Sequence, residues 1–257
     1  MIRLGPGGTA GLGYDEGIPR IAKLGLSALE VEFTHGVNMK NDAALRVGEL
    51  ARRHNIRLSI HAPYFCNLAS KEKPKIHATI NRVLQSCERG HHMGAEYVVF
   101  HAGFYQDRDK KAVYELVKDG IAKIQDTIKE KGWNVQLAPE TTGKATQFGD
   151  LDELIQLHNE LGCHLTVDFS HLRARFGRRD YDEIFSKLKG IKHIHSHFSG
   201  IEYSDKGERR HIMTPEKEMR ELLQHVLNKN RDITVINESP DPIGDALRTK
   251  KILDSML

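Results

Sequence analysis

Eight short runs of strand-forming residues recur along the chain, and helical patterns lie between them. The runs cover residues 2–4, 28–33, 57–60, 97–100, 135–138, 165–167, 191–194 and 233–236. The helical patterns include residues 43–53, 76–92, 112–131, 151–161, 181–188 and 215–227. A repeated strand and helix predicts a parallel sheet covered by helices. Because the chain has 257 residues, close to the usual length of a (βα)8 barrel, we predict a single α/β TIM-barrel domain over residues 1–257.

Composition narrows the class of protein. The chain is 39% hydrophobic and 28% charged, which is typical of a globular fold and excludes disorder. No stretch approaches the roughly 20 apolar residues of a membrane span, and the first residues lack a secretory signal. Cys66, Cys87 and Cys163 are too far apart for a CxxC metal site, and we interpret them as free thiols. We expect a cytoplasmic monomer with no membrane partner.

The residues that follow the predicted strands are unusually polar. Catalytic groups of (βα)8 barrels lie at the C-terminal ends of the strands, so these positions are the ones that bear on function. Six consecutive strands place a potential metal ligand there: His61, His101, Glu140, Asp168 with His171 behind it, His195 and Glu238. These side chains should therefore meet on one face of the barrel.

This set of side chains predicts a metal centre. Converging carboxylates repel one another unless a cation lies between them. Histidine mixed with carboxylate, without cysteine, suits Zn²⁺ or Mn²⁺. The ligands exceed the three or four of one catalytic ion, so we expect two or three ions, with Glu140 as the bridge between the first two.

One segment matches the signature of a known family. His61-Ala62-Pro63-Tyr64-Phe65-Cys66-Asn67-Leu68 resembles the H-x-x-Y-x-x-N-L signature of the endonuclease IV family of apurinic/apyrimidinic DNA repair nucleases. Later segments resemble its other motifs in the right order: His101-Ala102-Gly103, Pro139-Glu140-Thr141, Val167-Asp168 with His171, His195 with Ser199, and Glu238-Ser239-Pro240. The resemblance covers roughly residues 59–240. It implies a trinuclear zinc barrel that cleaves damaged double-stranded DNA on the 5′ side of an abasic site.

The resemblance also implies a role for each ligand. The first ion would be held by His61, His101 and Glu140, and the second by Glu140, Asp168, His195 and Glu238. The third would be held by His171, His211 and a carboxylate two residues before His211. Arginine occupies that place, as Arg209, and cannot bind a cation, so Glu208 is the best substitute. Of these ligands, we expect Glu140 and Glu238 to be catalytic.

Contacts to DNA are predicted at two places. Tyr64 aligns with a family residue that wedges into the duplex, although a tyrosine packed at the barrel rim is equally consistent with the sequence. Arginines near the sixth strand and before His211 are candidates for phosphate contacts, the alternative being a solvated loop: Arg175, Arg178, Arg179 and Arg209.

The N-terminal segment departs from the family. The family follows its first strand with G-x-H-x-S, whereas this chain has Gly5-Pro6-Gly7-Gly8. The spacing Gly5-x-Gly7-x-x-Ala10, with Glu30 ending the second strand, also imitates a dinucleotide fingerprint. A Rossmann turn opens directly into a helix, but three more glycines follow here. We therefore expect a mobile substrate loop and no nucleotide cofactor.

Two other functions fit part of the pattern. Glu140, Asp168, His195 and Glu238 match the Glu-Asp-His-Glu set of sugar isomerases and epimerases of the xylose-isomerase-like barrels. That alternative leaves four histidines without a role: His61, His101, His171 and His211. A metal-stabilised protein that binds DNA without turnover is the third candidate.

Overall fold

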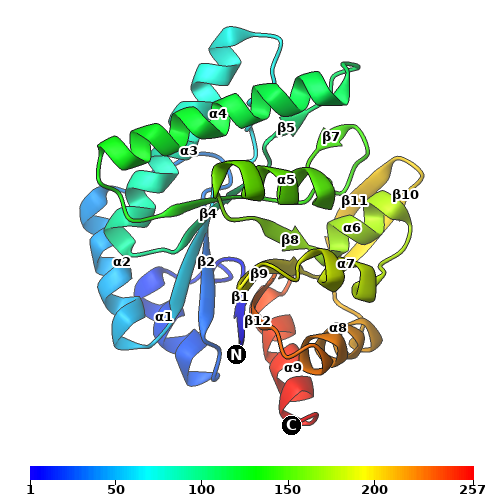
Figure 1. The fold of residues 1–257 in the computed structure, drawn as a ribbon. Helices are drawn as coiled ribbons and strands as arrows, with labels where there is room; N and C mark the ends of the chain where they lie inside the picture. The colour runs from blue at the N-terminus through cyan, green and yellow to red at the C-terminus, as the bar shows by residue number, and fades with distance from the viewer.

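Eight parallel strands form a barrel in the computed structural model, which describes residues 1–257 (Figure 1). The barrel strands are β1 (Ile2–Pro6), β2 (Ala28–Glu32), β3 (Arg57–His61), β4 (Tyr97–Phe100), β6 (Gln136–Pro139), β8 (Thr166–Asp168), β9 (His193–Phe198) and β12 (Asp232–Asn237). Hydrogen bonds join them in the orders β1-β12-β9-β8 and β2-β3-β4-β6. Parallel bridges from Gly7 to Glu30 and from Glu140 to Thr166 connect the two sheets. The predicted barrel is confirmed.

A glycine allows the close approach of two neighbouring barrel strands, β1 and β2. A Cβ atom at Gly5 would lie 1.9 Å from the carbonyl oxygen of Ala28, far inside van der Waals contact. Strands β1 and β2 therefore approach each other closely only because residue 5 has no side chain.

Helices surround the barrel (Figure 1). They are α1 (Tyr14–Lys23), α2 (Asn41–Arg53), α3 (Lys73–Met93), α4 (Lys110–Glu130), α5 (Leu151–Leu161), α6 (Phe169–Phe176), α7 (Tyr181–Lys187), α8 (Glu216–Asn228) and α9 (Pro242–Asp254). Aspartates cap several of them; at α5, Asp150 and Glu153 form a reciprocal capping box. No helix combines the length and the apolar character that crossing a membrane requires.

Several barrel strands, among them β2, β3 and β12, alternate between apolar and polar residues. Leu29 and Val31 of β2 belong to the apolar core, and the intervening Glu30 is fully buried and bonded to Ser59 and His195 of other strands. Successive side chains of a strand point to opposite faces, so the apolar set packs against the helices and the polar set fills the barrel. The inside of this barrel is therefore polar well below its C-terminal end.

Two small antiparallel sheets extend beyond the barrel, and the strand pattern did not predict either one. The first pairs β5 (Gly103–Phe104) with β7 (Gln147–Phe148), which α4 and β6 separate in the chain. The second is a hairpin of β10 (Gly200–Ser204) and β11 (Gly207–Ile212). Helix α6 contacts both strands of this hairpin and occupies part of the segment expected as a charged loop. The three cysteines are buried free thiols, as predicted.

Candidate metal centre

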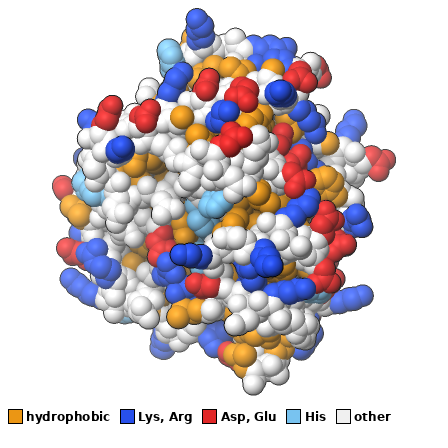
Figure 2. Space-filling model, in the orientation of Figure 1, with side chains coloured by type: hydrophobic (Ala, Val, Ile, Leu, Met, Phe, Trp, Pro, Cys, Tyr) orange, Lys and Arg blue, Asp and Glu red, His pale blue; other side chains and the backbone are white.

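Histidines and carboxylates gather at the C-terminal end of the barrel, where a pocket of about 430 Å³ opens. Its lining includes His61, Tyr64, His101, Glu140, His171, Glu208, His211 and Glu238. In the space-filling view, histidine side chains lie in a hollow of this face with lysine and arginine beside it (Figure 2). The structure thus brings the predicted ligands together, with one exception.

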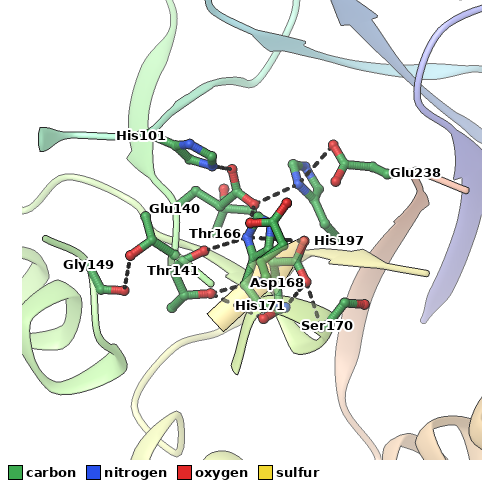
Figure 3. A network of polar contacts seen from close by, with 12 residues as sticks. His101, Glu140, Thr141, Gly149, Thr166, Asp168, Ser170, His171, His197 and Glu238 are labelled. Atoms are coloured by element: carbon green, nitrogen blue, oxygen red, sulfur yellow. Dashed lines mark hydrogen bonds and ion pairs between the residues drawn. The ribbon is translucent and has the colours of Figure 1, made fainter. Parts of the chain in front are cut away.

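Glu140 lies at the centre of the cluster (Figure 3). Its carboxylate oxygens lie 2.8 Å from His101 Nε2, 3.2 Å from His61 Nε2, and 3.1 and 3.2 Å from the Nδ1 atoms of His171 and His197. Burial alone would raise the pKa of this carboxyl, but the surrounding histidines hold the pKa well below its usual range. Glu140 therefore carries a full negative charge between four imidazoles.

The histidines are held so that one ring nitrogen faces the pocket. Nδ1 of His61 lies 2.7 Å from the carbonyl oxygen of Ala62, and Nδ1 of His171 lies 2.9 Å from that of Thr141. Only a protonated nitrogen can bond a carbonyl, so in both rings Nδ1 donates, and Nε2 is the ring atom that faces the carboxylates and would bind a cation. An outer hydrogen bond of this kind fixes the tautomer of a metal-binding histidine.

The expected position of His195 is wrong. Strand β9 runs on to Phe198, so His195 lies inside the barrel, with Nε2 2.9 Å from Glu30. His197, two residues later, reaches the cluster, with Nδ1 3.2 Å from Glu140 and 3.3 Å from Glu238. A strand end placed too early shifts the ligand by one inward-facing position.

Glu30 supports His197 from within the barrel, and sequence reasoning missed both residues. Glu30 accepts hydrogen bonds from Ser59 Oγ at 2.6 Å and His195 Nε2 at 2.9 Å, and its other oxygen lies 2.8 Å from His197 Nε2. The signal was present: His193, His195 and His197 alternate along one strand and so share its inner face.

A β-bulge settles which carboxylate accompanies His171 and His211. His211 pairs with Ile201, Arg210 pairs with Glu202, and Glu208 pairs with Tyr203, so Arg209 is an extra residue. The bulge moves Glu208 to the face that residue 209 would otherwise occupy. Glu208 lies 3.3 Å from His171 Nε2 and 3.8 Å from His211 Nε2, whereas Arg209 points outward. The offset of one residue is thereby corrected.

Gly143 makes room for this arrangement. A Cβ atom there would lie 2.7 Å from Glu208 Cβ and 3.1 Å from His171 Cδ2. The backbone N–H of Glu208 donates to the carbonyl of Gly143 at 3.1 Å. The hairpin of β10 and β11 therefore packs against the backbone of Gly143, and this contact requires a residue without a side chain.

The ligands form three overlapping groups that fit metal ions. They are His61, His101 and Glu140; then Glu140, Asp168, His197 and Glu238; and then Asp168, His171 and His211, with Glu208 beside the last two. Asp168 Oδ2 is a buried atom without a hydrogen-bond partner; the nearest ring nitrogen, Nδ1 of His171, lies 3.3 Å away and already donates to the Thr141 carbonyl. Buried polar atoms are rarely left unpaired, so the donor set suits cations.

The residues expected to contact DNA lie in different surroundings. Tyr64 is 48% exposed, borders the pocket and packs against His61, at 5.2 Å between ring centroids. Arg209 and Arg178 are exposed. Arg175 instead donates to the carbonyls of Lys144 and Gln147, and the nearly buried Arg179 pairs with Glu218. Arg175 and Arg179 therefore bind the protein itself, which contradicts their predicted role.

Comparison with known proteins identifies the family that shares this architecture. The sequence profile of the xylose isomerase-like TIM barrel matches residues 18–256. The chain belongs to the xylose isomerase-like TIM barrel family. Within it, an uncharacterized protein of Methanocaldococcus jannaschii is 37% identical over 97% of both chains. A protein named probable endonuclease 4 from Metamycoplasma arthritidis is 28% identical over 74% of both chains, which confirms the resemblance to endonuclease IV.

Solved structures of the family share this fold. Endonuclease IV from Thermus thermophilus superposes with a TM-score of 0.74 at 17% identity, covering 99% of both chains. A D-tagatose 3-epimerase-like protein superposes with a TM-score of 0.73 at 20% identity, covering 98% of this chain and 96% of the other. The fold is therefore common to nucleases and sugar epimerases, and the side chains at the strand ends must distinguish the two activities.

Proposed function

We propose that this xylose isomerase-like barrel is a metal-dependent phosphodiesterase that cleaves double-stranded DNA on the 5′ side of abasic sites. The observation that supports it most is the third ligand group, His171, Glu208 and His211, beside the two groups around Glu140. A barrel that isomerises sugars at one ion has no use for these additional ligands. The mixed histidine and carboxylate set favours Zn²⁺, with Mn²⁺ as the alternative.

Each residue of the centre has a definite part in this proposal. Glu140 would hold the first two ions together, because His61 and His101 lie at one of its oxygens and His197 at the other. Asp168, His197 and Glu238 would complete the second site. The bound ions would supply an activated water as nucleophile and stabilise the charge that develops on the phosphate.

Charge favours an anionic substrate at this pocket. Three Zn²⁺ ions would carry six positive charges, and Glu140, Asp168, Glu208 and Glu238 would return four negative ones. The remaining positive charge would attract a phosphate of the DNA backbone. Exposed Tyr64, at the edge of the pocket, is in position to enter a gap left by a missing base.

Basic residues at the pocket are better candidates for phosphate contacts than the internally bonded arginines. Lys144 lines the pocket, and Arg209 is exposed on the neighbouring hairpin. Replacing both with alanine should reduce the slope of binding affinity against salt by about 0.9 for each lost phosphate contact. Arg53→Ala is the control, because this exposed arginine lies in the last turn of α2 and does not line the pocket. An unchanged slope in the double variant would remove Lys144 and Arg209 from the interface.

The decisive experiment combines incision with substitution of the third group. A duplex with one central abasic analogue should be nicked on its 5′ side by protein loaded with Zn²⁺ or Mn²⁺, and chelation should stop the reaction. His211→Ala should reduce incision strongly. If no incision occurs and ketose epimerisation is observed that survives His211→Ala, the protein is an epimerase. That alternative is supported by the Glu140, Asp168, His197 and Glu238 set.

A further inference from the structure

Glu32 is a carboxylate of the pocket that the proposed metal sites do not use. Neither of its oxygens is exposed to solvent, and neither has a hydrogen-bond donor. Burial raises the pKa of Glu32 to about 7. A buried carboxylate without a partner is costly, so its retention points to a ligand that supplies the missing donor.

A second unpaired group lines the same pocket. Ser239 is 5% exposed, and its Oγ atom has no hydrogen-bond partner. Gly7 lies between the elements that carry these two residues, and a Cβ atom there would lie 3.1 Å from Glu32 Oε1 and 3.6 Å from Glu238 Cγ. The carboxylate of Glu32 and the hydroxyl of Ser239 therefore border the part of the pocket above Gly7. Any larger side chain at position 7 would narrow this part of the pocket.

The surroundings decide among ligand classes. An anion would be repelled by Glu32 and Glu238. Glu30, Glu32 and Glu238 lie close enough together to hold a cation, but such an ion would compete with the second metal site for Glu238. It would also compete for Glu30, which accepts from Ser59 and His195 and lies against His197. A hydroxyl group can donate to Glu32 and accept from Ser239 at once.

We propose that Glu32, Ser239 and the space above Gly7 form a subsite for a sugar hydroxyl next to the phosphate at the metal centre. This inference rests on the proposed function in one respect, namely that the substrate is a DNA strand. An abasic deoxyribose carries a hydroxyl at C1′, where an intact nucleotide carries a base. The subsite therefore reads the C1′ hydroxyl of an abasic sugar.

The test compares two duplexes that differ only in this hydroxyl. One contains a freshly prepared natural abasic site, and the other contains the tetrahydrofuran analogue, which has hydrogen at C1′. Wild-type protein should prefer the natural site by about 10-fold in kcat/KM, the scale of a hydrogen bond to a charged group. The preference should fall to about 1 in Glu32→Met and to an intermediate value in Ser239→Ala. Glu16→Met, an exposed change on α1, should keep it.

Further measurements separate the explanations. Glu32→Met should also raise the melting temperature of the ligand-free protein, because an unpaired buried carboxylate is removed. An unchanged preference in both pocket variants overturns the subsite. A metal content that is lower in Glu32→Met also overturns it, because Glu32 would then be a ligand. If neither duplex is cut by wild-type protein, the proposed function fails; calorimetric binding of free 2-deoxyribose, lost in Glu32→Met, would still support the subsite, and its absence would overturn it.

Discussion

The cluster around Glu140 and the group formed by His171, Glu208 and His211 face the same pocket but are supported differently. Glu140, Asp168 and His197 lie at the ends of barrel strands or one residue from them, and they are at most 1% exposed. Glu208 and His211 lie on a two-stranded hairpin, and their side chains are 21% and 20% exposed. The barrel fixes the first set through its closed hydrogen-bonded strands, whereas the second set depends on how the hairpin is seated.

This difference has an energetic consequence. A two-stranded hairpin is marginally stable alone and needs a packing partner. Here α6 and the backbone at Gly143 provide it. We therefore expect damage to the barrel cluster to abolish the centre, and damage to the hairpin to loosen one ion while the other two stay bound.

Glu140→Gln should have the largest effect. The amide cannot bridge two cations, so the first two ions should be lost together and incision should fall by roughly 1,000-fold or more, equivalent to about 4 kcal/mol. Elemental analysis of the purified variant measures the loss. Glu183→Gln, an exposed change on α7, is the control. Retention of all ions with full activity would show that Glu140 is not the bridge.

Glu208→Ala should remove one ion selectively. Asp168, His171 and His211 would then remain without the carboxylate that the hairpin supplies, and affinity for the third ion should fall by roughly 100-fold. Anomalous diffraction should show the two sites around Glu140 still filled. Glu202→Ala, on the paired strand of the same hairpin, should keep every ion. Loss of all ions from Glu208→Ala would mean that the hairpin and the barrel cluster are not separable.

The same contrast explains what could be read from the sequence. Ligands that directly follow a short apolar run, such as His61, His101 and Glu140, were predicted from that position alone. His197 was missed because polar, inward-facing histidines continue strand β9 beyond its apolar residues. The alternation of histidines at every second residue predicts the length of this strand better than its run of apolar residues does.

Features created by tertiary contacts were beyond sequence reasoning. The bulge at Arg209 depends on pairing with Glu202 and Tyr203, which a single strand does not reveal. Arg175 resembled a phosphate contact in the sequence, but backbone carbonyls of Lys144 and Gln147 engage its guanidinium. Whether an arginine faces solvent or protein is decided by folding.

Gly143→Ala should have a smaller effect than Glu208→Ala. The added methyl group meets Glu208 and His171, so the hairpin should move outward and weaken the third ion by about 10-fold, as loss of a supporting contact does. Titration of metal-depleted protein with Zn²⁺ measures this affinity. Gly190→Ala, where an added Cβ meets nothing within 4 Å, is the control. Equal affinities for Zn²⁺ in both variants would show that the packing of the hairpin against Gly143 does not affect the third metal site.

Arg209→Asp should have the smallest effect, although it restores the carboxylate position of the family pattern. The bulge directs residue 209 toward Glu202, so the new carboxylate should point away from His171 and His211. Affinity for the third ion should therefore change by no more than about 0.5 kcal/mol, as for other surface substitutions.

Deletion of Arg209 is the informative partner of that substitution. It removes the bulge but leaves Glu208 two residues before His211, on the same face of a regular strand. The third ion should stay bound in the deletion variant, because the carboxylate still faces the histidines. The opposite result would be tighter binding of the third ion in Arg209→Asp together with loss of that ion from the deletion variant. The pairing of β10 with β11 would then adjust to whichever carboxylate binds the ion. In that case the third site would cause the bulge, and the bulge would not be what positions the third site.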